Sequence, residues 1–365
     1  MDIEKTKEAL KRAEAELKKM EDKAFNVWFF VIDSKGTPCG SLEYIYETAL
    51  QLKKLGYNVK MMYAEKDFEG VRGWLGDEYA DLPHYNCEEQ IAISPSDFMF
   101  IPEVYSSVMS KTKNLQCKRV VILQNYGYLT DTMPLGTTWE DMGIYDCVTT
   151  TNNLSDTIKG IFRGVNVRIV PPSIPRYFTK GDSTSKFVIN IVAKNPSDVN
   201  AIVKPYQWKY PISKWTSFRD LKNLSRKEFA DALKDSFATV WIDDTTDFGY
   251  SAIEAMAAGN IVIGKIPSGE PEWMFNYDGS LANNGLWFYN LKDAHAAISS
   301  VVETVLHEAV PEEIKKNMEE TVKTYSPERQ LAAIKKVYEE DLFENRKKEI
   351  IIAINGFKKM IEENK

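Results

Sequence analysis

The apolar and polar positions near the start of the chain predict a strand, a helix and a second strand. Val27–Asp33 (VWFFVID) is a nearly continuous apolar run, typical of a strand that is buried on both faces. Leu42–Leu55 has the periodicity of an amphipathic helix that ends at Gly56, and Val59–Tyr63 is again strand-like. This order predicts a βαβ unit with parallel strands and a right-handed crossover.

The same alternation continues along the chain and predicts two doubly wound α/β halves. In the first half, further strands are expected at Phe98–Ile101, Val120–Leu123, Cys147–Thr150 and Val167–Val170. In the second half, strands are expected at Phe187–Ala193, Ala238–Ile242, Ile261–Ile263 and Leu286–Tyr289. Helices are expected at Leu224–Leu233, Ser251–Ala258, Leu291–His307, Glu312–Thr324 and Pro327–Lys365.

These elements divide the chain into four parts. Residues 1–23 form a helical extension, residues 24–180 a first Rossmann-like domain, and residues 181–340 a second one. Residues 341–365 form a C-terminal helix that is placed to pack back on the first domain. The polar segment Thr179–Lys186 (TKGDSTSK) is the expected linker between the domains.

The helical extension carries apolar positions that recur three and four residues apart, in the manner of a short heptad seam. This seam either pairs with a second copy, giving a homodimer, or docks on its own domain. Docking is favoured, because so few heptads make a weak coiled coil. The seam consists of Ile3, Thr6, Leu10, Ala13, Leu17 and Met20.

Composition and charge narrow the class of protein. The chain has 365 residues, 44% hydrophobic and 27% charged, as expected of a two-domain globular protein. Its net charge of −7 argues against a polyanionic partner. No apolar run is long enough to span a bilayer and the N-terminus is charged, so a cytoplasmic protein without integral membrane contact is expected.

Cysteine and histidine usage argues against metal and triad chemistry. The cysteines lack C-x-x-C spacing and are expected to be reduced thiols. The histidines are scattered, which gives no support to a zinc site or a histidine-based triad. These residues are Cys39, Cys87, Cys117, Cys147, His84, His295 and His307.

The segment Asp247–Gly264 (DFGYSAIEAMAAGNIVIG) is the strongest candidate for a ligand site. A turn at Gly249 leads into a helix, whose N-terminal N–H groups and dipole suit a phosphate. Glu254, one turn into the helix, can accept hydrogen bonds from sugar hydroxyls, so a nucleotide-sugar is the predicted ligand. The competing interpretation is a capping box between Ser251 and Glu254, which is slightly favoured on this segment alone.

Other candidate residues follow predicted strands directly. Ligands of parallel α/β sheets bind at the carboxyl ends of the strands, where the loop that contains Gly36 and Gly40 lies. Glu103 follows one strand of the first domain, and Gln124 and Asn125 follow the next. All of these residues are therefore expected to face the cleft between the domains.

In their order along the chain, these motifs resemble those of GT-B glycosyltransferases, specifically the retaining family 4 group. The resemblance covers nearly the whole chain after residue 23. The matching segments are Gly40–Glu43 (GSLE), Val167–Phe178 (VRIVPPSIPRYF), Ala193-Lys194, Thr246–Ile263 (TDFGYSAIEAMAAGNIVI), Ser268–Glu272 (SGEPE) and Asn284–Leu286 (NGL).

The resemblance implies two Rossmann-like domains that face each other across a cleft, the first binding the acceptor and the second the nucleotide-sugar. It implies that Glu254 holds the ribose hydroxyls and that Lys194 neutralises the diphosphate, with Asp247 also at the catalytic centre. The acceptor side is expected to contain Glu103, Gln124 and Asn125. The remaining donor-binding residues implied are Gly40, Ser41, Thr246, Phe248, Gly249, Tyr250 and Ser251.

The chain departs from the family pattern at several positions. Thr246 stands where the family has the first glutamate of its paired motif, which leaves the identity of the sugar and activity itself open. Val199 stands near the family's second basic position, for which Lys204 or Lys214 are the possible substitutes. The family's histidine in the first domain has no counterpart, and Glu103 or Gln124 are candidates to line that region.

The resemblance further implies that a sugar passes from a nucleoside diphosphate to an acceptor hydroxyl with retention of configuration. The leaving phosphate could take the acceptor's proton, and no cofactor or metal is needed beyond the donor. Asp243-Asp244 is accordingly interpreted as a loop pair.

Three alternative functions stay open at this point. Trp208–Lys227 interleaves aromatic and basic residues, so a DNA-modifying transferase of the viral type is possible, acting on a hydroxymethylated base. The favoured view of this segment is that its aromatic residues are core and its cations solvated. The other two alternatives are a degenerate subunit that binds only nucleotide and a nucleotide-sugar epimerase.

Overall fold

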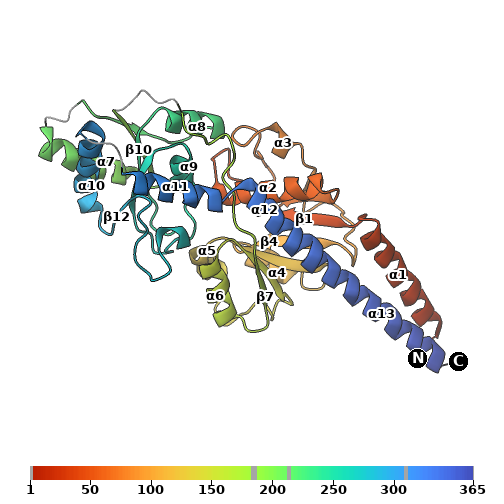
Figure 1. The fold of residues 1–365 in the computed structure, drawn as a ribbon. Helices are drawn as coiled ribbons and strands as arrows, with labels where there is room; N and C mark the ends of the chain where they lie inside the picture. The colour runs from red at the N-terminus through yellow and green to blue at the C-terminus, as the bar shows by residue number, and fades with distance from the viewer. Residues whose placement is uncertain (1–2, 182–186, 212–214, 308–310, 365) are drawn as a thin grey trace.

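The computed structural model describes residues 3–181, 187–211, 215–307 and 311–364, and these form two α/β lobes (Figure 1). The sheet of the N-terminal lobe is parallel throughout, in the order β3-β2-β1-β4-β5-β6-β7. Its strands are β1 (Asn26–Phe30), β2 (Asn58–Tyr63), β3 (His84–Asn86), β4 (Phe98–Pro102), β5 (Lys118–Leu123), β6 (Asp146–Thr149) and β7 (Asn166–Ile169). Its helices are α2 (Gly40–Lys54), α3 (Asp77–Ala80), α4 (Ser106–Lys111), α5 (Tyr126–Thr132) and α6 (Asn152–Ile161).

The C-terminal lobe contains a second parallel sheet, in the order β12-β11-β10-β8-β9. Its strands are β8 (Val188–Ala193), β9 (Ser217–Asp220), β10 (Ala238–Ile242), β11 (Ile261–Lys265) and β12 (Leu286–Phe288). Its helices are α7 (Pro196–Lys209), α8 (Arg226–Lys234), α9 (Tyr250–Ala257), α10 (Ala294–His307) and α11 (Glu312–Thr324). The predicted α/β class with two parallel sheets is confirmed.

The central strand β1 shows why the apolar run VWFFVID folds as a strand between two layers. Successive side chains of a strand point to opposite faces. Val27 and Phe29 pack into the core on the α2 side of the sheet, while Trp28 and Phe30 pack into the core on the other side. Both faces are covered, so no position of this strand needs to be polar.

The strands β3 and β9 were not predicted from the sequence. Both are short edge strands whose residues are mixed in polarity: HYN in β3 and SFRD in β9. The strand β9 lies inside Trp208–Lys227, the segment considered for nucleic-acid binding. Phe218 packs on the core there, whereas Trp208 is 75% exposed, so the segment's aromatic residues are divided between core and surface.

The chain returns to the N-terminal lobe through a long run of helix. It comprises α12 (Pro327–Ile334), a π-helical segment (Lys335–Phe343) and α13 (Glu344–Glu363). Ile334 and Tyr338 already pack in the same core as Phe29, so the return begins before residue 341, where the last part of the chain was expected to start.

The N-terminal helix α1 (Ile3–Glu21) lies beside α13 at one end of the molecule (Figure 1). Thr6 and Met20 of the predicted seam are buried, and Leu10, Ala13 and Leu17 pack partly buried against the N-terminal core. The seam therefore docks on its own domain. A homodimer through this helix stays a prediction.

Two expectations fall partly outside the described residues. The expected linker, Thr179–Lys186, is described only up to residue 181, and Lys214 lies outside the described part of the chain.

Within the described ranges, no helix is long and apolar enough to cross a bilayer.

Candidate functional site

A cavity of about 770 Å³ lies between the two lobes and is lined by residues from both. Its N-terminal wall comes from the start of α2 and from the loops that follow β1, β4, β5 and β6. Its C-terminal wall comes from the loops after β8, β9 and β10 and from the start of α9. The cavity is therefore bordered by the carboxyl ends of strands in both sheets, where open α/β sheets bind ligands.

The turn before α9 depends on glycine at position 249. Gly249 is the N-cap residue and has φ +76°, and a Cβ atom there would lie 2.6 Å from Cζ2 of Trp241. The side chain of Thr246 stabilises this turn, because its Oγ1 accepts hydrogen bonds from the N–H of Phe248 (3.3 Å) and of Gly249 (3.1 Å). Thr246 thus organises the backbone that was expected to surround the phosphates.

The capping box between Ser251 and Glu254 is wrong for this helix. The helix begins at Tyr250, its N-cap is Gly249, and no side chain caps it. Glu254 is only 1% exposed and lines the cavity from the second turn of α9. Its carboxylate is therefore available for a role other than capping.

Glu254 belongs to an ion-pair network that joins the two lobes. Arg226 is the first residue of α8. Its Nη1 lies 3.2 Å from Glu254 Oε2, and its Nη2 contacts Glu254 Oε1. The same guanidinium reaches α2 of the other lobe, with Nε 2.9 Å from Glu43 Oε2 and Nη2 3.1 Å from Glu43 Oε1. Burial raises the pKa of Glu43, the charge of Arg226 opposes that shift, and the charge of Glu254 reinforces it.

The sequence analysis missed Arg226, although it predicted the start of α8. The capping box between Ser225 and Glu228 is present, and it places the next residue, Arg226, in the first turn of the helix. That signal locates Arg226 on the chain. It does not show that two carboxylates from distant segments converge on it.

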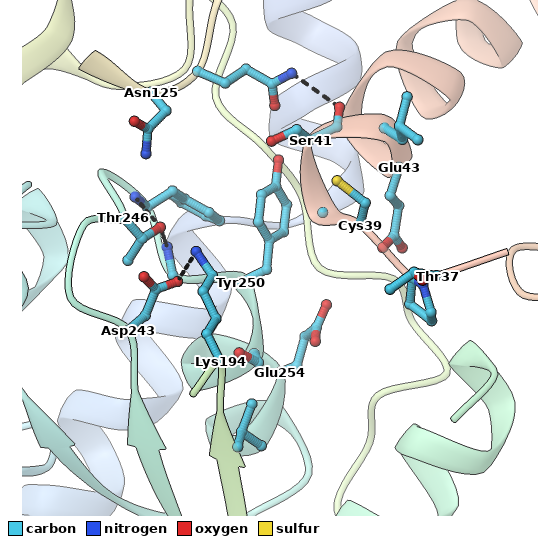
Figure 2. A pocket seen from close by; sticks show the side chains of 18 of the residues that line it. Thr37, Cys39, Ser41, Glu43, Asn125, Lys194, Asp243, Thr246, Tyr250 and Glu254 are labelled. Atoms are coloured by element: carbon cyan, nitrogen blue, oxygen red, sulfur yellow. Dashed lines mark hydrogen bonds and ion pairs between the residues drawn. The ribbon is translucent and has the colours of Figure 1, made fainter. Parts of the chain in front are cut away.

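Gly40 and Ser41 begin α2 and lie opposite α9. A Cβ atom at position 40 would lie 2.7 Å from Cδ2 of Tyr250, so the glycine permits close contact between the lobes. Ser41 accepts a hydrogen bond from Gln124 Nε2 at its backbone oxygen (3.0 Å). Figure 2 shows Ser41 and Glu43 on one side of the cavity and Lys194, Asp243 and Glu254 on the other.

Lys194 directly follows β8, and its Nζ lies 2.8 Å from Asp243 Oδ2 (Figure 2). Its side chain is 62% exposed. Its position in the cavity wall leaves it accessible to a ligand. Lys204 lies in α7 and does not line the cavity, whereas Lys222, which sequence reasoning did not select, does.

Asp247, expected at the catalytic centre, is not among the cavity-lining residues. Its Oδ2 accepts a hydrogen bond from the backbone N–H of Tyr126 in the other lobe (2.9 Å). Next to it, Asn125 Nδ2 donates to the backbone oxygen of Thr245 (3.0 Å). Burial raises the pKa of Asp247 to about 6. In this structure Asp247 connects the lobes beside the cavity.

Glu103 is a buried carboxylate in the N-terminal wall of the cavity. Its Oε1 accepts hydrogen bonds from the backbone N–H of Gln124 (3.1 Å) and Asn125 (2.8 Å), so it shapes the turn that follows β5. Burial raises the pKa of Glu103 to about 7, while these hydrogen bonds act in the opposite direction. Gln124 and Asn125 line the cavity beside it.

Replacing Glu103 with glutamine is expected to change how stability depends on pH. The folded pKa of about 7 lies above the ordinary carboxyl value of about 4.3, so between these values the folded chain binds more protons than the unfolded chain. Stability therefore falls as pH rises through this window. In Glu103→Gln the fall becomes smaller, as measured by urea denaturation at about pH 5 and about pH 7. An unchanged fall would show that Glu103 titrates normally.

Within the described residues, no group of three or more His, Cys, Asp or Glu side chains is arranged to hold a metal ion. The two aspartates after β10 have cationic partners: Asp243 pairs with Lys194, and Asp244 pairs with Lys265. The cysteines Cys39, Cys87, Cys117 and Cys147 are free thiols.

Comparison with solved structures identifies the fold. A glycosyltransferase from Rickettsia africae superimposes with a TM-score of 0.58 at 13% identity, over 87% of this chain and 98% of the other. The pneumococcal O-GlcNAc transferase, in complex with UDP and GlcNAc, gives 0.60 at 9% identity, over 87% and 99%. An α-glucosyltransferase in complex with UDP and a DNA 13-mer that contains a hydroxymethyluracil base gives 0.58 at 13% identity, over 85% and 99%.

At these identities the likeness shows the fold, and the chain has the two-lobed GT-B fold of these glycosyltransferases. In sequence, no family model matches the chain, and no curated protein matches it. The function must therefore be argued from the cavity and its residues.

Proposed function

We propose that this protein is a retaining glycosyltransferase, similar to family 4, that moves a sugar from a nucleoside diphosphate to an acceptor hydroxyl without a metal. The observation that carries the proposal is the buried carboxylate of Glu254, which the second turn of α9 holds in the cavity between two GT-B lobes. A carboxylate whose two oxygens are each bound once by Arg226 can still accept hydrogen bonds from a pentose.

The donor site follows from the residues around Glu254. The exposed side chain of Lys194 supplies a positive charge for the diphosphate. The N-terminal end of α9, at Tyr250 and Ser251, supplies a helix dipole that favours the same anion. Gly40 lets α2 approach this point closely from the other lobe. Positive groups aimed at the leaving diphosphate stabilise the charge that develops as the glycosidic bond breaks.

The arrangement needs no protein nucleophile. The departing phosphate oxygen takes the proton of the acceptor hydroxyl, and the sugar is transferred on the same face. Contacts between the lobes, including those of Asp247 and Arg226, help to keep water away from the donor. The free cysteines accord with a reducing compartment, and we place the activity in the cytoplasm.

A donor panel tests the proposal. In a panel of UDP-, GDP-, ADP- and CMP-sugars, we expect a nucleoside diphosphate sugar to raise the melting temperature, because a ligand at 100 times its Kd stabilises the folded state by about 2.7 kcal/mol. The free sugar at the same concentration is the control and should give no shift. If no nucleotide-sugar raises the melting temperature, the proposal is wrong. Binding without any release of nucleotide would indicate a degenerate subunit.

A further inference from the structure

Thr246 and Asp247 are neighbours in the sequence, but their side chains bind different turns. The Oγ1 of Thr246 accepts hydrogen bonds from two N–H groups of the turn before α9, beside the proposed diphosphate site. Asp247 reaches the N-terminal lobe, where its Oδ2 accepts a hydrogen bond from the N–H of Tyr126, the first residue of α5 (2.9 Å). Two adjacent residues therefore connect the proposed donor side to the opposite wall of the cavity.

A carboxylate from each lobe holds the turn that Asp247 contacts. Glu103, in the N-terminal lobe, accepts hydrogen bonds from the N–H groups of Gln124 and Asn125. Asp247, in the C-terminal lobe, accepts from the next N–H of the chain, that of Tyr126. Gln124 and Asn125 line the cavity on the proposed acceptor side, so the backbone of that side is held partly by the C-terminal lobe.

The segment that carries Asp247 is closely packed and leaves its side chain little freedom. Asp247 is 8% exposed. Gly269, in the loop behind it, permits close approach, because a Cβ atom there would lie 2.9 Å from the backbone nitrogen of Asp247. A second hydrogen bond between the lobes lies next to it, from Asn125 Nδ2 to the backbone oxygen of Thr245 (3.0 Å). The position of Asp247 therefore fixes the distance between the two turns.

The contact uses Asp247 as a hydrogen-bond acceptor more than as a charge. Burial raises the pKa of Asp247 to about 6, and the charge of Asp243 adds to the shift, whereas the hydrogen bond from Tyr126 opposes it. Unlike Asp243 and Asp244, it forms no ion pair with a cation among the described residues. Its surroundings disfavour the charge, so a neutral amide, which also offers an acceptor oxygen, should replace it well.

We infer that Asp247 is a positioning residue, which fixes the turn at Gln124–Tyr126 to the turn before α9 and does so as a hydrogen-bond acceptor, without contacting the sugar. This inference rests on the proposed glycosyl transfer, and it takes the place of the catalytic role that the resemblance implies for Asp247. A nucleoside diphosphate that contacts both walls binds best when the lobes are in contact. It therefore gains affinity from Asp247 indirectly.

Amide hydrogen exchange, resolved to single residues, tests the contact itself. In Asp247→Ala, the N–H of Tyr126 should exchange at least about tenfold faster than in wild type. The N–H groups of Gln124 and Asn125, which Glu103 holds, should keep their protection. In Asp247→Asn the acceptor oxygen remains, so exchange at Tyr126 should stay within about threefold of wild type.

Asp244→Ala is the matched control for these variants. Asp244 follows the same strand, but its carboxylate pairs with Lys265 of its own lobe and its side chain is 58% exposed. Its loss should leave the N–H of Tyr126 as protected as in wild type.

Calorimetric titration with the nucleoside diphosphate that the donor panel selects tests the coupling. Asp247→Ala should raise its Kd by about 3- to 10-fold, although Asp247 does not line the cavity, and Asp247→Asn should stay within about twofold of wild type. A residue that bound the ligand through its charge would lose as much affinity in Asp247→Asn as in Asp247→Ala.

The outcomes separate this inference from the proposed function. Equal losses of nucleotide affinity in Asp247→Asn and Asp247→Ala would overturn the inference, as would unchanged exchange at Tyr126 or an unchanged Kd in Asp247→Ala. If Asp247→Ala does not fold, the Kd of Asp247→Asn decides, because a loss of more than about twofold contradicts the inference. If wild type binds no nucleoside diphosphate, the proposed function fails, while the exchange pattern still shows whether Asp247 holds the turn.

Discussion

Arg226→Met is expected to lower the free energy of unfolding by about 3–5 kcal/mol, because it leaves two buried carboxylates without their shared cation. Glu43 and Glu254 come from opposite lobes, and Arg226 is the cation that the structure places between them. The substitution also removes the guanidinium from its position over the Phe178 ring, 4.8 Å from the ring centroid. Urea denaturation monitored by tryptophan fluorescence measures the loss.

Lys222→Met is the matched control for this prediction. Lys222 lines the same cavity, but its ion pair with Asp220 is partly exposed, with side-chain exposures of 32% and 36%. Partly exposed pairs contribute at most about 1 kcal/mol, so this variant should unfold almost as wild type does. Equal losses in the two variants would show that the Arg226 network does not hold the lobes together in solution.

Glu254→Gln is expected to weaken binding of the nucleoside diphosphate by roughly 10- to 100-fold. Hydrogen bonds to a charged group contribute about 1.5–3 kcal/mol, and the neutral amide loses that charge while keeping the shape of the side chain. The amide oxygen can keep one of the two hydrogen bonds from Arg226, which also keeps its ion pair with Glu43, so the fold should survive. Isothermal titration calorimetry of wild type and variant gives the ratio of the two Kd values.

Glu43→Gln shows whether Glu254 contacts the nucleotide directly or affects nucleotide binding only through Arg226. It neutralises the other carboxylate that binds Arg226, without touching Glu254. If Glu254 contacts the ligand, Glu43→Gln should change the nucleotide Kd by less than about threefold. Equal weakening in the two variants would mean that the effect passes through Arg226 and that Glu254 does not bind the pentose.

The parts of the fold that sequence reasoning predicted correctly are those with a local signal. The two-sided apolar run of β1 and the amphipathic pattern of α2 report how each segment is buried, so the βαβ unit followed from them. The serine and glutamate that cap α8 interact within one turn. The edge strands β3 and β9 lack such a signal, because their polar residues and short length resemble those of a loop.

Only those features of the site that lie within one continuous segment could be predicted from the sequence. The glycine turn and the helix that bears Glu254 were found, because they lie next to each other in the sequence. The pairing of Glu254 with Arg226 and the contact of Asp247 with Tyr126 depend on how the two lobes meet. No local pattern encodes these contacts.

The most direct test of the central claim compares the preferred nucleoside diphosphate with its 2′,3′-dideoxy analogue, in wild type and in Glu254→Gln. If the Glu254 carboxylate binds the ribose hydroxyls, wild type should lose roughly 10- to 100-fold in affinity for the analogue. Glu254→Gln should discriminate between the two ligands much less than wild type does, because its neutral amide hydrogen-bonds the hydroxyls more weakly than the carboxylate. The same large preference for the hydroxylated ligand in both proteins would contradict the account.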